Sequence, residues 1–160
     1  MSEEKKTQEE EQEFQDYLQE KNKVILQTHT MINHYLCGDI IKHEKGYVEV
    51  ELETESEMVV DELGLVHGGF VFGAADFAAM AAVNEKNVVL VQSECQFLAP
   101  VKEGDKVLFK AQVRHKEGRK RNVHVKAYVH DIKVFEGEFI TVITEKHVLR
   151  LKLYNDDDKE

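Results

Sequence analysis

The chain is poor in positive charge, in proline and in cysteine. Its 160 residues carry 21 Lys and Arg against 31 Asp and Glu, which gives a formal net charge of −10. This excess of negative charge opposes binding to nucleic acid and to anionic membrane surfaces. The only cysteines, Cys37 and Cys95, are too few for a disulfide framework. The sequence therefore predicts no nucleic-acid partner, no membrane partner and no disulfide-stapled scaffold.

Long hydrophobic runs are also missing. The longest apolar run covers residues 68–83, is shorter than the ~20 residues that a membrane helix needs, and contains a carboxylate. The first residues, MSEEKKTQEEEQEF, are acidic and lack the apolar centre of a secretory signal. We therefore expect a cytoplasmic protein. A chain of 160 residues is long enough for one domain with a substantial core.

The most informative segment is that same run, which reads GGFVFGAADFAAMAAV. It is rich in alanine and apolar on every side, which predicts a helix buried inside the domain. Asp76 is its only ionisable residue. A carboxylate in such a place loses its hydration, which costs several kcal/mol unless partners compensate. This position favours a functional role for Asp76, with His67, Gly68 and Gly69 one to two turns upstream as its companions.

Two structural alternatives stay open for these residues. Asp76 can instead cap the backbone of a neighbouring subunit, because buried polar groups are usually satisfied. His67 can be a hydrogen-bonded turn histidine. None of the other histidines shows the spacing typical of metal ligands, so we expect no metal.

On both sides of the buried helix the hydrophobic pattern changes to a period of two. Val48, Val50 and Leu52 alternate with glutamates, which is typical of a strand with one wet face. Further strands are predicted over 40–43, 89–97, 107–113, 123–129 and 132–144. In the second of these the alternate residues Val89, Val91, Ser93, Cys95 and Phe97 point one way, and Glu136-Gly137 is a candidate bulge in the last. An α+β architecture, with an antiparallel sheet curled around one long central helix, hides residues 68–83 completely.

The ends of the chain look different from this central part. Residues 1–13 are mostly Glu, Gln and Lys, and we expect them to be disordered or frayed. Residues 14–37 carry an apolar stripe at three- and four-residue steps, which predicts an extra N-terminal amphipathic helix that ends at Gly38. The main domain is then 38–150, and residues 151–160 form a solvated acidic tail.

Three segments taken in order resemble a known family. They are Gly64-Leu65-Val66-His67-Gly68-Gly69, then Ala74-Ala75-Asp76, then Phe97-Leu98-Ala99-Pro100-Val101-Lys102-Glu103-Gly104-Asp105. Together they resemble the hot-dog fold thioesterases, and most closely the phenylacetate-pathway-type branch of the 4-hydroxybenzoyl-CoA thioesterase superfamily. The resemblance covers roughly residues 38–146. The family usually has Asn six residues before the His, whereas this chain has Asp61, a candidate substrate contact.

The resemblance implies an acyl-CoA thioesterase that releases a free acid and coenzyme A. It suggests Asp76 as general base or nucleophile, the Gly69 N–H as main oxyanion donor, and His67 and Gly68 as parts of the same turn. It also implies a homodimer or homotetramer, with Asp76 of one chain serving a substrate held by the turn of another. Coenzyme A enters as part of the substrate, and no cofactor is implied.

A basic run around a predicted hairpin could hold the nucleotide end of coenzyme A, because Arg binds phosphate bidentately. Its candidate residues are Arg119, Lys120 and Arg121, although such a run is also typical of a solvated turn. Two other functions remain. One is a non-catalytic acyl-CoA or acyl-carrier-protein binding hot-dog protein that acts as a ligand sensor. A DNA-binding sensor would need a basic helix-turn-helix, which the acidic N-terminus argues against. The other, a hot-dog dehydratase, fits the HGG pattern less well.

Overall fold

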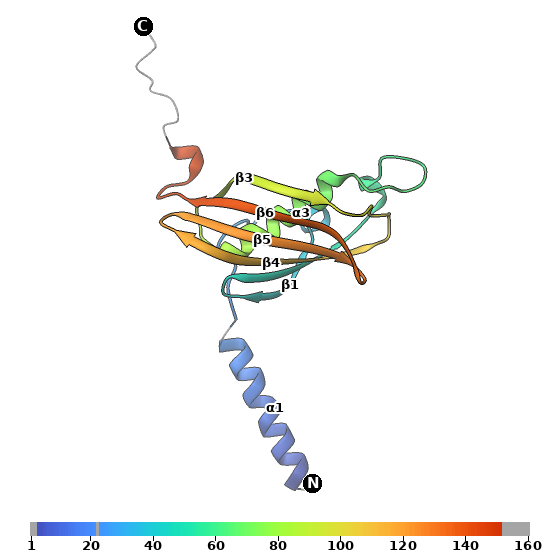
Figure 1. Ribbon diagram of the computed structural model, residues 1–160. Helices are drawn as coiled ribbons and strands as arrows, with labels where there is room; N and C mark the ends of the chain where they lie inside the picture. The colour runs from blue at the N-terminus through green and yellow to red at the C-terminus, as the bar shows by residue number, and fades with distance from the viewer. Residues whose placement is uncertain (1–2, 22, 152–160) are drawn as a thin grey trace.

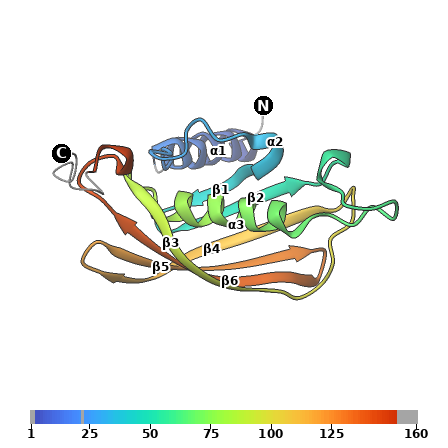
Figure 2. The ribbon, with the colours of Figure 1, turned by 90° about the horizontal axis from the view of Figure 1, so that it is seen from above.

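The computed structural model describes residues 3–21 and 23–151 and consists of one antiparallel sheet wrapped around one helix (Figures 1 and 2). The helices are α1 (Glu3–Lys21), α2 (His34–Cys37) and α3 (Gly68–Val83). The strands are β1 (Asp39–Glu44), β2 (Tyr47–Glu53), β3 (Val88–Phe97), β4 (Lys106–Glu117), β5 (Lys120–Val129) and β6 (Ile132–Ile143). Two short 3-10 turns, η1 (Ser56–Met58) and η2 (Val148–Arg150), complete the described elements. The predicted α+β architecture is confirmed.

The sheet has six strands in the order β1-β2-β4-β5-β6-β3, and every neighbouring pair is antiparallel. Alternate residues of its strands face α3, and the register places Val50, Phe109 and Ala127 side by side, all fully buried. The small alanines on α3 let the sheet come close to the helix, and Ala74, Ala78 and Ala81 are fully buried there. This packing explains why residues 68–83 can be apolar all round.

Two details of the predicted strands are wrong. The pairing of β3 with β6 shifts register between Leu90 and Gln92 and skips Val91, which is 56% exposed, so that Val89 and Ser93 lie on opposite faces of the strand instead of sharing one. The predicted bulge at Glu136-Gly137 is also absent, because Gly137 pairs regularly with Cys95. Gly137 instead allows a close approach, since an added Cβ would lie 2.7 Å from the Cβ of Cys95.

The irregularity of β6 lies nearer its start. There the pairing with β5 jumps from Ala127↔Phe135 to Tyr128↔Lys133 and leaves Val134 as the extra residue. Both Val134 and Phe135 are consequently buried. The bulge therefore lies where two consecutive residues are both buried, and not at the glycine where it was predicted.

The predicted single helix over 14–37 is wrong as well. Helix α1 covers Glu3–Lys21, including most of the segment expected to fray, and has no buried residue; it projects from the sheet in Figure 1. The chain then crosses α3 in an extended form, where Val24, Leu26 and Thr28 are at least partly buried while the residues between them are exposed. We call residues 23–33 the strap. Most of the predicted tail, residues 152–160, lies outside the described residues.

The strap is extended because tertiary contacts replace helical ones. The side chain of Asn84, at the end of α3, accepts a hydrogen bond from the Gln27 N–H at 2.7 Å and donates one to the Ile25 carbonyl at 2.9 Å. These bonds occupy backbone groups that a helix would have paired internally. The helical pattern of apolar residues is therefore overridden between Lys23 and Asn33, and helix resumes only at α2, which Asn33 caps.

Candidate active site

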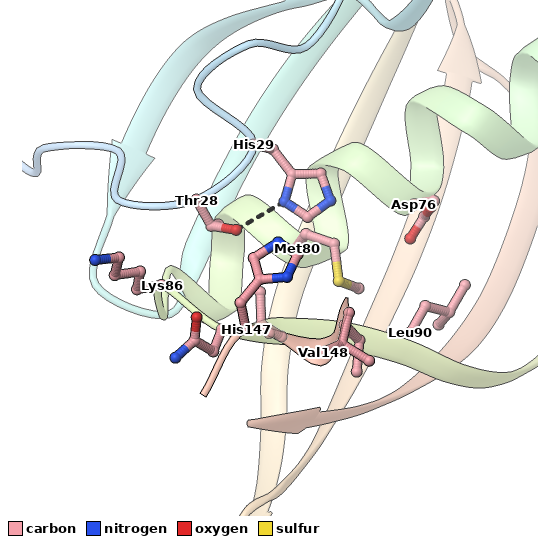
Figure 3. A pocket seen from close by; sticks show the side chains of 11 residues that line it. Thr28, His29, Asp76, Met80, Lys86, Leu90, His147 and Val148 are labelled. Carbon is pink, nitrogen blue, oxygen red and sulfur yellow. Dashed lines mark hydrogen bonds between the residues drawn. The ribbon is translucent and has the colours of Figure 1, made fainter. Parts of the chain in front are cut away.

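Asp76 lies two turns into α3 and faces a space between the strap and the start of strand β3. Its Oδ1 is buried and has no hydrogen-bond partner within the described residues. The side chain faces a cavity of about 510 Å³, together with Met80 and Leu90 (Figure 3). A buried carboxylate oxygen without a partner is costly, which distinguishes Asp76 from an ordinary structural acid.

Burial sets the ionisation of this acid. Desolvation raises the pKa of Asp76 from its usual 3.8 to about 6. The carboxylate also acts on its neighbour: burial first, and then the negative charge of Asp76, raise the pKa of the Cys37 thiol. At pH 7 the site therefore holds a carboxylate that is basic enough to accept a proton and a thiol that stays protonated.

The turn before α3 is built from the other two predicted motifs. The Val66 N–H donates to the Val101 carbonyl at 2.9 Å, and the Glu103 N–H donates to the Gly64 carbonyl at 2.8 Å. Gly68 lies against Phe97, because an added Cβ would approach the Phe97 ring to 3.3 Å. The HGG segment and the segment 97–105 thus form one structural unit at the N-terminus of α3.

His67 is the N-cap of α3, and its Nδ1 accepts the Gly69 N–H at 2.8 Å. The amide predicted as oxyanion donor is therefore already engaged in this structure. A neutral His67 then carries its proton on Nε2, because Nδ1 is an acceptor. The Gly68 N–H makes no hydrogen bond within the described residues. The turn consequently offers the Gly68 amide and the His67 Nε2–H, and it offers the Gly69 amide only if the imidazole turns away.

The turn and the acid are not adjacent within one chain. Seven residues of helix separate Gly69 from Asp76, a rise of ~10 Å. Gly68 lines a small cavity of about 210 Å³ with Phe97 and Val101, which is separate from the cavity at Asp76. The structure thus places Gly68 and Asp76 on one helix but in two different cavities.

Asp61 has a local role in the described structure. Its Oδ1 accepts the N–H of Leu63 at 3.0 Å and the N–H of Leu65 at 3.2 Å, as in an Asx turn. The side chain thereby shapes the loop that leads into His67. A contact of Asp61 with substrate stays a prediction.

The basic hairpin lies at the other end of the sheet from the turn. Arg119 pairs with Glu145, and Arg121 donates to the carbonyls of Gly118 at 2.7 Å and Lys120 at 3.0 Å. The Asn87 side chain in turn donates to the Glu145 carbonyl at 3.3 Å, which ties the hairpin to the loop after α3. Arg119 is therefore linked through Glu145 to Asn87 at the edge of the Asp76 cavity, whereas none of Arg119, Lys120 and Arg121 lines that cavity.

Sequence reasoning missed most of the residues around Asp76. The strap contributes Thr28 and His29, the loop after α3 contributes Lys86, and the segment after β6 contributes His147 (Figure 3). Thr28 is only 6% exposed and its hydroxyl lies 2.8 Å from His29 Nδ1. One feature of the sequence indicates the extended strap: the run from Val24 to Thr30 is rich in β-branched and polar residues, which have a lower helix propensity than the residues on either side.

The described residues contain neither a metal-binding cluster nor a membrane-spanning helix. Across residues 3–21 and 23–151, no group of three His, Cys, Asp or Glu side chains is arranged to hold a metal ion. In the same part of the chain, no helix is both long and apolar enough to cross a membrane.

Solved structures share the fold of this chain. The uncharacterized protein PH1136 from Pyrococcus horikoshii is 52% identical, covers 79% of this chain and 97% of its own, and has a TM-score of 0.78. The Streptococcus mutans UA159 protein smu.793, solved with acetyl CoA bound, is 24% identical over 74% of this chain and 97% of its own, with a TM-score of 0.66. At that lower identity the likeness establishes the fold alone.

Curated relatives extend beyond the region that they share with this chain. Methylthioribose-1-phosphate isomerase from Aquifex aeolicus is 50% identical over 73% of this chain, but that region is only 26% of the isomerase. Transcription factor FapR from Thermoanaerobacter is 29% identical over 76% of this chain, which is 61% of FapR. The chain thus spans about a quarter of the first relative and about three fifths of the second.

A family model provides the assignment. The model described as the thioesterase superfamily matches residues 63–136, which contain the HGG turn, Asp76 and the segment 97–105. The fold and the three motifs described above agree with this match. The chain therefore belongs to the thioesterase superfamily.

Proposed function

We propose that this protein hydrolyses the thioester bond of an acyl-CoA, giving a free acid and coenzyme A. The observation that carries the proposal is the Asp76 carboxylate: its Oδ1 is buried without a hydrogen-bond partner in the described residues, and it faces a cavity that can admit an acyl group. Membership in the thioesterase superfamily and the acetyl-CoA-bound structural relative support this reading.

In the proposed reaction, Asp76 takes a proton from a water molecule while the water oxygen attacks the thioester carbon. The carbonyl oxygen gains negative charge and is stabilised by the Gly68 amide together with either the His67 Nε2–H or, once the imidazole turns away, the Gly69 amide. The carbon–sulfur bond then breaks, and the proton held by Asp76 passes to the departing thiolate. Direct attack by Asp76 to form a mixed anhydride is the alternative within the same scheme, and it also needs the ionised acid.

The separation of Asp76 from the turn supports a site shared between subunits. The ~10 Å between Gly69 and Asp76 of one chain is too long for both to act on one carbonyl. Strand β3 is an edge strand with Val91 exposed, so a second copy can continue the sheet there. A homodimer in which each turn meets the partner's acid is therefore the proposed minimum unit, and a homotetramer is the proposed higher assembly.

A second candidate function is supported by one comparison. The match to FapR, which is named a transcription factor and not an enzyme, favours a regulatory role. For this chain that role would be a sensor that binds an acyl-CoA or acyl-carrier-protein thioester without cleaving it. In that case Asp76 would satisfy a partner or ligand instead of a water. Both functions need the same cavity, so binding alone does not separate them.

The test is to measure both hydrolysis and binding of a small panel of acyl-CoA thioesters with the parent chain and with Asp76→Ala. The proposal predicts that the variant folds, binds the thioesters and loses about 10²-fold or more of the turnover. The matched control is Asp39→Ala, which removes an exposed carboxylate of β1 and should keep full turnover. Binding without hydrolysis by the parent chain would favour the sensor, and full turnover by Asp76→Ala would refute the assigned role.

A further inference from the structure

The cavity at Asp76 has two chemically different ends. Near Asp76 the lining is apolar, with Met80, Leu90 and Val148. The other end holds the Lys86 side chain, which Figure 3 draws on the far side from Asp76, and the imidazoles of His29 and His147 are drawn between the two. Asp76 is the only carboxylate among the lining residues.

This polar end continues into a second cavity of about 390 Å³. The two cavities share five lining residues, and the second also contains Arg150 and no carboxylate. The shared residues are Thr28, His29, Lys86, Asn87 and His147. In a chain with a net charge of −10, a continuous space lined by basic groups and free of acids beyond Asp76 is a selective environment for an anion.

The basic groups at this end of the cavity have no acidic partner within the described part of the chain. Among residues 3–21 and 23–151, neither Lys86 nor Arg150 forms an ion pair. His147 Nδ1 accepts the Leu149 N–H at 3.1 Å, so a neutral His147 carries its proton on Nε2 and donates from there. Three donors are thus available to a ligand in one place.

His29 is held at this end by a strained backbone. Its φ is +52°, a left-handed conformation that side chains other than glycine rarely adopt. The strap maintains it: Asn84 binds the backbone at Gln27 and Ile25, and the Ile32 N–H closes a turn on the His29 carbonyl at 3.1 Å. Burial lowers the pKa of His29, so at neutral pH this ring is an uncharged hydrogen-bonding group beside the cations.

We propose that Lys86, His147 and Arg150 form an anion-binding subsite that holds a negatively charged group of the thioester ligand. The inference rests on the proposed function only in taking that ligand to be an acyl-CoA. Two parts of such a ligand carry the required charge: a carboxylate at the far end of the acyl group, or the phosphates of the nucleotide. Lys and Arg bind both kinds of oxyanion by charge-assisted hydrogen bonds.

Calorimetric binding tests the subsite without relying on catalysis. The double variant Lys86→Gln/Arg150→Gln is compared with the parent, both in an Asp76→Asn background that prevents turnover, with acetyl-CoA and succinyl-CoA as probes. The subsite predicts that the double variant binds at least one probe about tenfold or more weakly. Both substituted residues are exposed, so the fold should be retained. The matched control is Lys106→Gln, an exposed lysine at the start of β4 that lines neither cavity.

The two probes identify the source of the charge. A loss confined to succinyl-CoA assigns the subsite to an acyl carboxylate, and an equal loss for both assigns it to the nucleotide phosphates. Unchanged affinity for both probes, an equal loss in Lys106→Gln, or no binding of either probe would overturn the inference. Failure of the proposed function looks different: the parent chain with Asp76 intact would then bind these thioesters, with dependence on Lys86 and Arg150, but not hydrolyse them.

Discussion

Gly69 and Asp76 lie on the same side of α3, about two turns apart. Seven residues rotate a helix by ~700°, so the two positions differ in direction by only ~20°, while the rise separates them by ~10 Å. An attacking atom has to come within about 3 to 3.5 Å of the carbon it attacks. Within one chain, the oxyanion turn and the acid therefore point in the same direction but lie too far apart to act on one carbonyl group. A site in which a second chain supplies one of the two groups has this geometry.

Substitution of Gly69 tests the geometry of the turn. In Gly69→Ala the new Cβ would lie 2.6 Å from His67 Nδ1 and 2.8 Å from its Cε1, so the imidazole has to leave its capping position. We expect a loss of about 10²-fold in kcat, the usual effect of disturbing one oxyanion donor, with little loss of stability. Steady-state kinetics on the best acyl-CoA of the panel measures this.

The matched control for that variant is Gly73→Ala on the same helix. An added Cβ at Gly73 meets nothing within 4 Å, and Ala is favoured over Gly inside a helix by about 0.5 to 1 kcal/mol. This variant should be as active as the parent and slightly more stable. Equal loss of activity in both glycine variants would show that the helix, and not the His67 contact, is sensitive.

The pH dependence of hydrolysis reports the ionisation of Asp76. Burial raises its pKa to about 6, and both forms of the proposed mechanism use the carboxylate. We therefore expect kcat/KM to fall as the pH drops through about 6, with a tenfold loss per unit below it. An acid limb centred near 4, as for an exposed aspartate, would contradict the burial of the acid in the working enzyme.

The same shift predicts how stability depends on pH. The pKa of Asp76 is higher in the fold than in the unfolded chain, so folding is penalised once the acid ionises. The penalty is absent below pH 3.8, grows as the pH rises from 3.8 to about 6, and is complete above that range. Asp76→Asn should therefore raise the free energy of unfolding by roughly 2 to 3 kcal/mol at pH 8. At pH 3.5 urea denaturation should show almost no difference, whereas a variant destabilised at both pH values would mean that Asp76 has a structural partner in the assembly.

The attachment of the strap depends on one side chain. Asn84 has a φ of +52°, which glycine also adopts easily, so Asn84→Gly keeps the helix end and removes the two hydrogen bonds to the strap. We expect faster amide hydrogen exchange over residues 23–33 and a loss of about 1 to 2 kcal/mol in stability. Unchanged exchange in the strap would show that Leu26 and Thr28 hold it without Asn84.

The sequence was sufficient for the sheet, the central helix and the turn because their signals are local. Alternating Val and Glu residues predict a strand with one solvent-exposed face, and an Ala-rich run without a polar face predicts a buried helix. The strap was missed because its apolar residues fit a helical period, while its actual conformation is decided by Asn84, nearly sixty residues further along the chain. The basic end of the cavity was missed for a similar reason, since Lys86 and His147 come together only when β3 pairs with β6.

The most direct measurement is a complementation experiment between Asp76→Asn and Gly69→Ala subunits. The two variants are co-expressed with different tags and the mixed pairs are purified through both tags. If the acid of one subunit serves the turn of the other, each mixed pair contains one site with both groups intact, and about half of the parent activity returns. Mixed pairs that stay as inactive as either variant alone would contradict a thioesterase site shared between two chains.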